Sequence, residues 1–212
     1  MGGRVVAVPA PPEPLDALDH LLVAGTLIHR VHSVARDADA FNPGRGSRTR
    51  FAPIRDPKIV PTLYAAETAD AAICETLLHD VPLTGDRLLL DAYRFTREST
   101  LEATRDLRLA KFMGDGLRRL GVDASQLTAT GAGDYGKTAA WAVAAHRAGF
   151  DGIAWMSPRE NTAAAYLLFG DRVGVRDVRL APHGLGPFTP PAPGFDWLST
   201  YCARVGVDVL LA

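Results

Sequence analysis

Strand-like and helix-like segments follow one another along this chain in no regular order, and this irregularity limits the folds that it can adopt. A doubly wound sheet requires strands and crossover helices to alternate, which the sequence does not show. Internal repeats and low-complexity segments are also missing. With 212 residues, the chain can bury one substantial core but is too short for two generous domains. We therefore expect a single-domain α+β fold.

Apolar periodicity and turn residues locate the expected elements. Strands are expected at 26–33, 87–96, 150–156 and 172–180. Helices are expected at 15–22, after an N-cap at Thr68, at 106–120, at 136–148, from an N-cap at Asn161 to 169, and at 196–205. The chain then divides into an N-terminal arm (1–14), a core domain (15–181), and a Pro-rich connection with a C-terminal helix packed on the domain (182–212).

Composition limits the partners and the compartment of the protein. The net charge is -1, so the chain has no overall basic field, and direct binding of nucleic acid is not expected. Positive charge is concentrated locally, because the loop at 41–58 carries five basic side chains and could bind an anion. Cys74 and Cys202 are too few for a disulfide framework, and no stretch resembles a membrane span or a signal peptide. We expect a cytoplasmic protein without membrane contact.

The stretch from Gly131 to Thr138 matches the P-loop pattern GxxxxGK[ST]. A phosphate loop needs a buried strand in front of it and a helix behind it, so that backbone N–H groups converge on the phosphates. Residues 124–130 contain a single large apolar side chain, which is unlike a central parallel strand. We favour a turn and helix cap here, with Lys137 on a solvated first turn, and keep nucleotide binding as an alternative.

Three polar residues stand where a core-forming residue would be expected. Arg30 lies within a strand-like run, Glu75 lies beside the apolar stripe of a helix, and Ser157 ends a strand. Taken singly, a salt bridge, a solvated helix position and a turn explain them better than catalysis does. Their sequence contexts, taken together, favour a functional role.

From about residue 24 to 180 the chain resembles the RES family, which is named for Arg, Glu and Ser residues. The resemblance rests on an ordered series of motifs: Leu27-Ile-His-Arg30-Val, Phe41-Asn-Pro, Arg50-Phe51, Leu63-Tyr64-Ala-Ala-Glu67, Ala72-Ile-Cys-Glu75-Thr-Leu-Leu-His79 and Asp151-Gly-Ile-Ala-Trp-Met-Ser157. It implies an ADP-ribosyltransferase-like fold with a split sheet that opens a cleft for NAD. It further implies a toxin that degrades NAD, with inorganic phosphate as co-substrate, and a cognate Xre-like helical antitoxin that blocks the cleft.

The resemblance carries catalytic roles over to three matching positions. Cleavage of the N-glycosidic bond builds positive charge on the ribose. An ionised Glu75 bound to a ribose hydroxyl would stabilise this charge. Arg30 has the planar fork that suits a phosphate, and Ser157 would position the ribose or the phosphate by hydrogen bonding.

Further residues complete the expected site. Tyr64 offers a ring face and a hydroxyl for nicotinamide, Arg50 adds charge near the phosphates, and Asn161 is a helix cap first and a ligand contact second. No metal is expected, because His29 and His32 would point to opposite faces of a strand and no Cys or carboxylate cluster completes a site.

Other functions remain open from the sequence. A protein ADP-ribosyltransferase would share the NAD cleft and differ in its acceptor. A binding module without activity would keep the cleft for a partner. The resemblance also leaves open whether phosphate or water attacks NAD, and a homodimer within a toxin–antitoxin complex is a further expectation.

Overall fold

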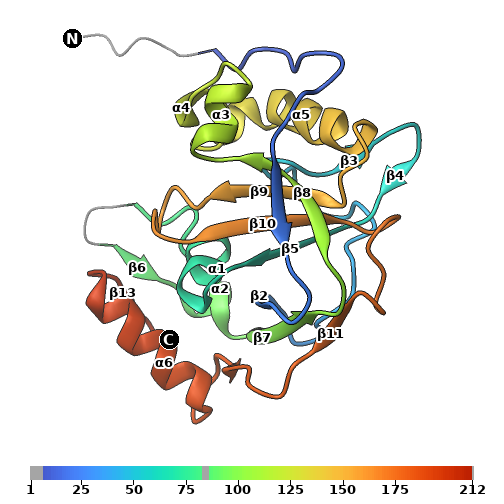
Figure 1. The fold of residues 1–212 in the computed structure, drawn as a ribbon. Helices are drawn as coiled ribbons and strands as arrows, with labels where there is room; N and C mark the ends of the chain where they lie inside the picture. The colour runs from blue at the N-terminus through green and yellow to red at the C-terminus, as the bar shows by residue number, and fades with distance from the viewer. Residues whose placement is uncertain (1–6, 83–85, 212) are drawn as a thin grey trace, which may run out of the picture.

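The computed structural model describes residues 7–82 and 86–211, and its centre is a curled, nine-stranded mixed sheet (Figure 1). The α+β expectation is confirmed. Among the strand pairs that the described residues form in this sheet, only β8 and β9 run parallel. The strands follow the order β1 (Asp19–Leu22), β8 (Leu107–Phe112), β9 (Gly152–Met156), β10 (Ala164–Phe169), β5 (Thr62–Ala66), β2 (Leu27–Ser33), β7 (Thr96–Ala103) and β11 (Val178–Leu180), with β12 (Gly186–Pro187) also on β7.

Two groups of helices flank the sheet at opposite ends (Figure 1). At one end lie α3 (Asp115–Arg119), α4 (Ala124–Leu127) and α5 (Tyr135–Arg147), the last preceded by the 3-10 turn η1 (Ala132–Asp134). Towards the other end lie α1 (Ala69–Thr76), α2 (Leu90–Tyr93) and α6 (Pro193–Arg204). Two small sheets pair β3 (Ile54–Arg55) with β4 (Ile59–Val60) and β6 (Arg87–Leu88) with β13 (Asp208–Val209).

The main sheet is split between β2 and β5. β2 pairs with β7 along its whole length, and β5 pairs with β10 along its whole length. Between β2 and β5, however, the register contains the single pair His29↔Ala66. The two strands therefore separate beyond His29, as the expected split sheet requires.

Three apolar clusters hold the elements together. The first lies under α5 and includes Trp141 and Phe112. The second joins α1 to α6 through residues such as Ile73 and Leu198. The third includes Ile28 and covers the opposite face of the sheet, because successive side chains of β10 enter the first and third clusters in turn.

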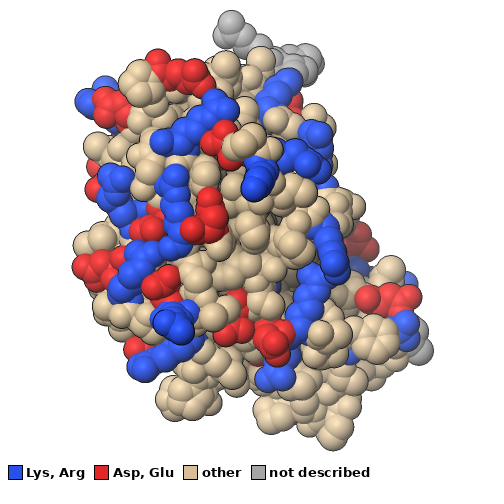
Figure 2. All heavy atoms as spheres, turned by 90° about the vertical axis from the view of Figure 1, so that its right-hand side faces the viewer, with Lys and Arg blue, Asp and Glu red and all other residues tan. Residues whose placement is uncertain are grey.

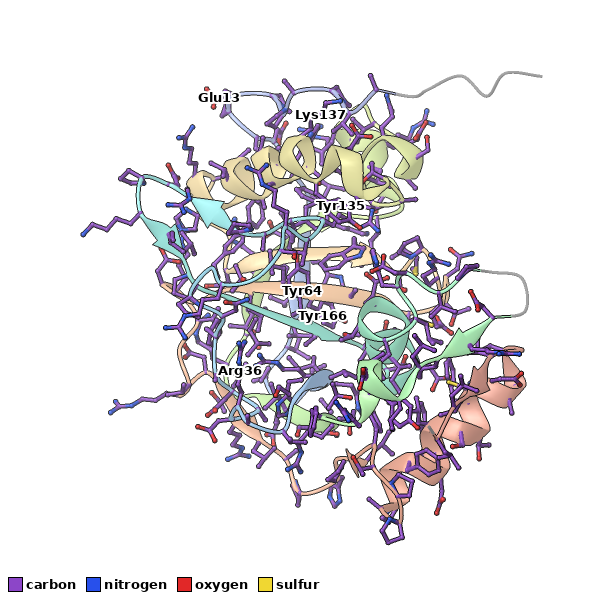
Figure 3. All side chains as sticks on the ribbon, turned by 180° about the vertical axis from the view of Figure 1, so that it is seen from behind. Glu13, Arg36, Tyr64, Tyr135, Lys137 and Tyr166 are labelled. Atoms are coloured by element: carbon purple, nitrogen blue, oxygen red, sulfur yellow. The ribbon has the colours of Figure 1, made fainter. Side chains whose placement is uncertain are left out.

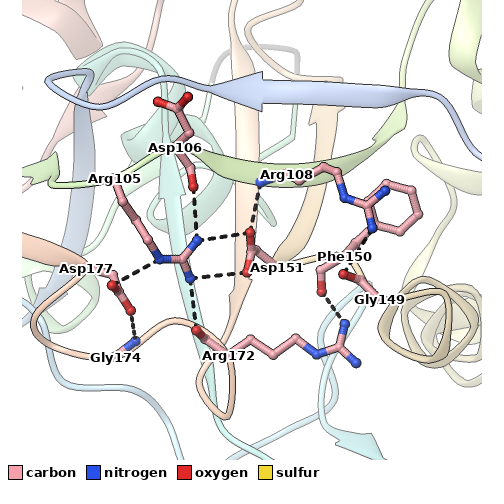
Figure 4. Close-up of polar contacts among 9 residues, drawn as sticks. All are labelled: Arg105, Asp106, Arg108, Gly149, Phe150, Asp151, Arg172, Gly174 and Asp177. Atoms are coloured by element: carbon pink, nitrogen blue, oxygen red, sulfur yellow. Dashed lines mark hydrogen bonds and ion pairs between the residues drawn. The ribbon is translucent and has the colours of Figure 1, made fainter.

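Arg105 ties three segments together at one end of the sheet (Figure 4). Its guanidinium donates to both carboxylate oxygens of Asp151, at 3.2 Å each, and to Asp177 Oδ1 at 3.1 Å. Asp151 also accepts from the backbone N–H of Arg108. The Asp151-Gly152 pair thus fixes the start of β9, and Gly152 is required there because a Cβ would lie 2.2 Å from Leu167 O.

Two expected helices are wrong, because pairing with other strands makes most of these residues extended although their apolar spacing predicts a helix. Residues 19–22 form the edge strand β1 on β8, and Leu21 of the supposed helical stripe is 53% exposed. Within the expected helix 106–120, residues 107–112 form the strand β8, and only 115–119 are helical. β8 is held between β1 and β9, so its backbone groups bond across the sheet rather than along a helix.

The expected helix at 161–169 is also wrong, since 164–169 form the strand β10. β10 is buried on both faces, and such a strand has an unbroken apolar run that periodicity cannot tell from a buried helix. The expected strands at 87–96 and 172–180 shrink to 87–88 and 178–180, and the long strand β7 begins only at Thr96.

The remaining expectations agree with the structure within a few residues. The strands at 26–33 and 150–156, the helices at 136–148 and 196–205, and the N-cap at Thr68 are confirmed, with Thr68 Oγ1 accepting from Ala71 N–H. Lys, Arg, Asp and Glu side chains are interspersed on the face shown in Figure 2, in keeping with the small net charge. None of the helices in the described ranges is long and apolar enough to cross a membrane.

Candidate functional site

A cavity of about 470 Å³ opens where β2 and β5 separate. Its wall includes Arg30 and Val31 on β2 and Tyr64 and Ala65 on β5, which lie next to the single register pair His29↔Ala66 on each strand. Other wall residues come from α1, from residues 47–50 of the basic loop at 41–58, and from the start of α5. This volume lies within the usual range of small-molecule sites.

Glu75 lines the cavity from the last turn of α1, and the Glu75 carboxylate is hydrogen-bonded to Ser157, which lies outside the cavity wall. Ser157 Oγ donates to Glu75 Oε1 at 2.7 Å and accepts from Glu160 N–H. Ser157 directly follows β9, is fully buried, and is not part of the cavity wall. The structure therefore brings Ser157 and Glu75 together, with Ser157 fixing the direction of the carboxylate.

Arg30 is a buried cation in the cavity wall, only 7% exposed. One guanidinium nitrogen, Nη1, donates to Ala38 O at 2.6 Å, and the other donors have no acceptor in the described part of the chain. Burial, and then the neighbouring Arg36, lowers the pKa of Arg30 to about 10. Arg30 still carries its charge at neutral pH, so it is a site for an anionic ligand group.

The basic loop is joined to the sheet through Tyr64, and through Arg50 to Thr130 and to Thr138 of α5. Arg50 is buried, donates to Thr130 O at 2.8 Å, and has a buried Nε without a partner among the described residues. Tyr64 shares a 2.7 Å hydrogen bond with Thr49 Oγ1, and burial raises its pKa to about 12. Both residues line the cavity, where Tyr64 packs edge-on against Trp155.

Two other expected features lie outside the cavity wall. Asn161 is exposed in the turn between β9 and β10, with a φ of 60°, and caps no helix. The segment before Gly131 contains the helix α4 rather than a strand, and Lys137 is paired with Asp134 at 2.8 Å. Figure 3 shows Lys137 on the outer side of α5, so the geometry of a phosphate loop is not met.

Sequence reasoning missed Tyr135 and His79, which both line the cavity. Tyr135 begins α5 and lies on the side of that helix that faces the sheet (Figure 3). Its hydroxyl lies 2.9 Å from His79 Nε2. His79 belongs to a motif quoted above, but only the tertiary fold brings the two residues together. His29 also lines the cavity, with Nδ1 2.9 Å from the fully buried Glu98.

Metal ligands do not gather within residues 7–82 and 86–211, where no three His, Cys, Asp or Glu side chains are arranged to hold an ion. The charged and aromatic polar residues of the cavity are arginines, tyrosines, histidines, Glu75 and Asp80, and the lining also includes Asn42 and several hydroxyl side chains. Such a set suits a ligand with phosphate groups and a hydroxyl-bearing ring.

Comparisons with known proteins identify a matching family and a similar solved structure. The family model described as the RES domain matches residues 27–188, more than half of the chain. A similar solved structure is the crystal structure of the M. tuberculosis MbcT-MbcA toxin-antitoxin complex, with a TM-score of 0.57 and 17% identity over 84% of this chain and 90% of that chain. At this identity the match shows a shared fold. No curated protein matches the chain in sequence.

Proposed function

This chain belongs to the RES-domain family, and on that premise we propose that it is a toxin that depletes NAD by breaking the nicotinamide–ribose bond. The observation that carries the proposal is the cavity itself. It places one oriented carboxylate, Glu75, in the same wall as the buried cations Arg30 and Arg50. NAD offers the matching groups, a ribose that becomes cationic and a pyrophosphate that is anionic.

Glu75 stabilises the transition state of bond cleavage. As nicotinamide leaves, the ribose becomes oxocarbenium-like, and a carboxylate hydrogen-bonded to a ribose hydroxyl lowers the energy of this charge. The hydrogen bond from Ser157 keeps the carboxylate in one orientation before the substrate arrives. In this proposal Ser157 acts through Glu75 rather than as a covalent nucleophile.

Arg30 and Arg50 hold the phosphate groups. Phosphate oxygens, either of the NAD pyrophosphate or of inorganic phosphate as co-substrate, accept from the free donors of Arg30 and are attracted by the charge of Arg50 in the cavity wall. Tyr64 presents its ring to nicotinamide, because its hydroxyl is already bonded to Thr49. Phosphorolysis then yields nicotinamide and ADP-ribose phosphate, and hydrolysis yields ADP-ribose.

A cognate antitoxin is the proposed protein partner. The similar structure described above is a toxin–antitoxin complex, which supports a partner of this kind. We expect a helical, Xre-like protein that covers the cavity opening. The product of the neighbouring gene, added to the purified protein, should form a stable complex and stop NAD loss. A neighbouring protein that neither binds nor inhibits would argue against this partner.

The decisive experiment incubates the purified protein with NAD, with and without inorganic phosphate, and identifies the products by mass spectrometry. Release of nicotinamide together with phosphorylated ADP-ribose establishes phosphorolysis, and release without phosphate establishes hydrolysis. Glu75→Gln should abolish either reaction while the fold is retained. Intact NAD under both conditions would overturn the proposal, and ADP-ribose attached to an added protein would favour the transferase alternative.

A further inference from the structure

Three side chains form a hydrogen-bonded chain that ends in the cavity. Asp80 Oδ1 lies 2.8 Å from His79 Nδ1, and His79 Nε2 lies 2.9 Å from the hydroxyl of Tyr135. All three residues line the cavity. The Asp80 side chain is almost fully exposed, the His79 side chain is partly buried, and Tyr135 is buried. The chain therefore runs from solvent to the inner wall of the site.

The direction of these hydrogen bonds follows from the chemistry of the groups. An ionised carboxylate can only accept, so Asp80 fixes the proton of His79 on Nδ1. Nε2 is then the acceptor for the Tyr135 hydroxyl. Burial raises the pKa of Tyr135, so its hydroxyl keeps its proton at neutral pH and can donate. The oxygen of Tyr135 retains lone pairs that can accept a hydrogen bond from a ligand.

The charged neighbours of this chain come from several elements. The Arg50 guanidinium lies 5.6 Å from the centre of the Tyr135 ring. Glu75 and Asp80 act on Tyr135 as negative charges, and Arg159 acts on it as a positive one while also donating to His79 O. Tyr135 thus sits among the groups that the proposed function assigns to NAD.

We propose that Tyr135, His79 and Asp80 form a proton relay for the nucleophile that attacks the ribose, an inference that rests on the proposed function. The attacking oxygen belongs to water or to hydrogen phosphate. As it bonds to the ribose carbon and nicotinamide departs with the bonding electrons, its proton passes to the Tyr135 oxygen. Tyr135 passes its own proton to His79 Nε2, and Asp80 stabilises the resulting imidazolium. Tyr135 is the catalytic residue, and His79 acts through it.

The relay supplies a proton acceptor, which Arg30, Glu75 and Ser157 do not provide. Arg30 and Arg50 are cations that cannot accept a proton, and Glu75 is engaged with Ser157 and, in the proposed complex, with the ribose. Histidine is the side chain that changes charge between about pH 5 and 8, which suits a proton acceptor at neutral pH. General base catalysis of this kind contributes about 10²- to 10⁴-fold to a rate.

The test measures kcat and KM for NAD cleavage from about pH 5.5 upward, above the range in which ordinary carboxyl groups titrate. Tyr135→Phe removes the hydroxyl, whereas His79→Gln keeps an acceptor for it that cannot take a proton. Each variant should lower kcat by about 100-fold or more with little change in KM. Wild-type kcat should fall at acidic pH, because protonated His79 accepts no proton, and this fall should be missing in both variants.

Tyr166→Phe and His183→Gln are the matched controls, since neither residue lines the cavity. Both should keep the wild-type rate and pH profile, and thermal unfolding should show that all four variants fold. Variants at Tyr135 and His79 that keep the wild-type kcat, or that lose rate but keep the acidic fall, would overturn the relay. A wild-type protein that leaves NAD intact would instead overturn the proposed function.

Discussion

At the scale of single residues, Ser157 and Glu75 show how a buried hydroxyl controls a carboxylate. Ser157 was expected to contact the ribose or the phosphate, but it lies behind Glu75 with no place in the cavity wall. A hydroxyl that is fully buried and donates at 2.7 Å to a charged oxygen restricts that oxygen to one direction. We therefore propose that Ser157 acts on NAD cleavage through Glu75.

We predict that Ser157→Ala lowers kcat for NAD cleavage by roughly 10- to 100-fold, because a hydrogen bond to a charged group is worth about 1.5–3 kcal/mol. KM should change less than kcat, since the phosphate-binding arginines are untouched. Steady-state kinetics of NAD consumption provide the measurement. Ser199→Ala is the control, because its hydroxyl is buried with no hydrogen-bond partner among the described residues. Equal rates for Ser157→Ala and the wild type would contradict the assignment.

At the scale of elements, local sequence signals locate some segments of the main sheet and miss others. β2 and β9 were predicted as strands from their β-forming or apolar runs, although both lie inside the sheet, and α5 was predicted as an alanine-rich helix that Gly149 ends. β10 was predicted as a helix, because a short apolar run that is buried on both faces carries no periodicity to distinguish strand from helix. β8 takes its strand form from β1 and β9, which lie far from it in the sequence, and no local pattern reports such pairing.

Gly149 after α5 and Gly152 at the start of β9 should respond differently to substitution by alanine. A Cβ on Gly152 would lie 2.2 Å from Leu167 O, so Gly152→Ala should prevent β9 from pairing with β10 and yield insoluble protein. Gly149, just after α5, has a φ of 88° but room for a Cβ, so Gly149→Ala should cost about 1–2 kcal/mol of unfolding free energy through backbone strain alone. Soluble yield and urea denaturation measure the difference. Equal stability of the two variants would contradict this interpretation.

The pairing of α5 with the turn between β3 and β4 should depend on pH. Arg147 donates to Asp56 at 3.0 Å, and this hydrogen bond holds the pKa of the Asp56 carboxyl below its ordinary range. A lowered carboxyl pKa stabilises the fold above the unfolded pKa, and this stability is lost as pH falls through the folded pKa. Asp56→Asn should therefore lower Tm at pH 7, with a difference that shrinks below about pH 4.

Thermal unfolding of Asp56→Asn and the wild type at several pH values provides the measurement. Asp91→Asn serves as the control, because Asp91 forms an exposed pair with Arg94 that should contribute little. A Tm difference that stays constant from pH 7 down to about pH 3 would show that Asp56 does not stabilise the fold through its charge.

At the scale of the whole molecule, the second apolar cluster connects the C-terminal helix to the site. Leu198 of α6 is fully buried in the same cluster as Ile73 of α1, and α1 carries Glu75. The tail at 182–212, treated in the sequence as a packed addition, thus supports the helix that presents the carboxylate. Tyr135 and His79 are 56 residues apart, so their contact likewise follows only from the complete fold.

Leu198→Ala should lower the free energy of unfolding by about 2–5 kcal/mol, the usual cost of an internal cavity. KM for NAD should stay unchanged at temperatures where the variant is folded, because Leu198 does not line the cavity. Chemical denaturation followed by kinetics on the same samples tests both statements. Leu211→Ala, at a residue that is 63% exposed, is the control and should match the wild type.

Because β2 and β5 share a single register pair, the sheet gives up stability at the place where the cavity opens to a ligand. Each further pair would add interstrand hydrogen bonds worth about 1 kcal/mol apiece and would close the space where Arg30 and Tyr64 face a ligand. Selection for a more heat-resistant variant would therefore favour further pairing between β2 and β5, and the resulting protein would be more stable but would lose the proposed NAD cleavage. Between β2 and β5, the same change that would make the protein more stable would also remove the proposed ligand site.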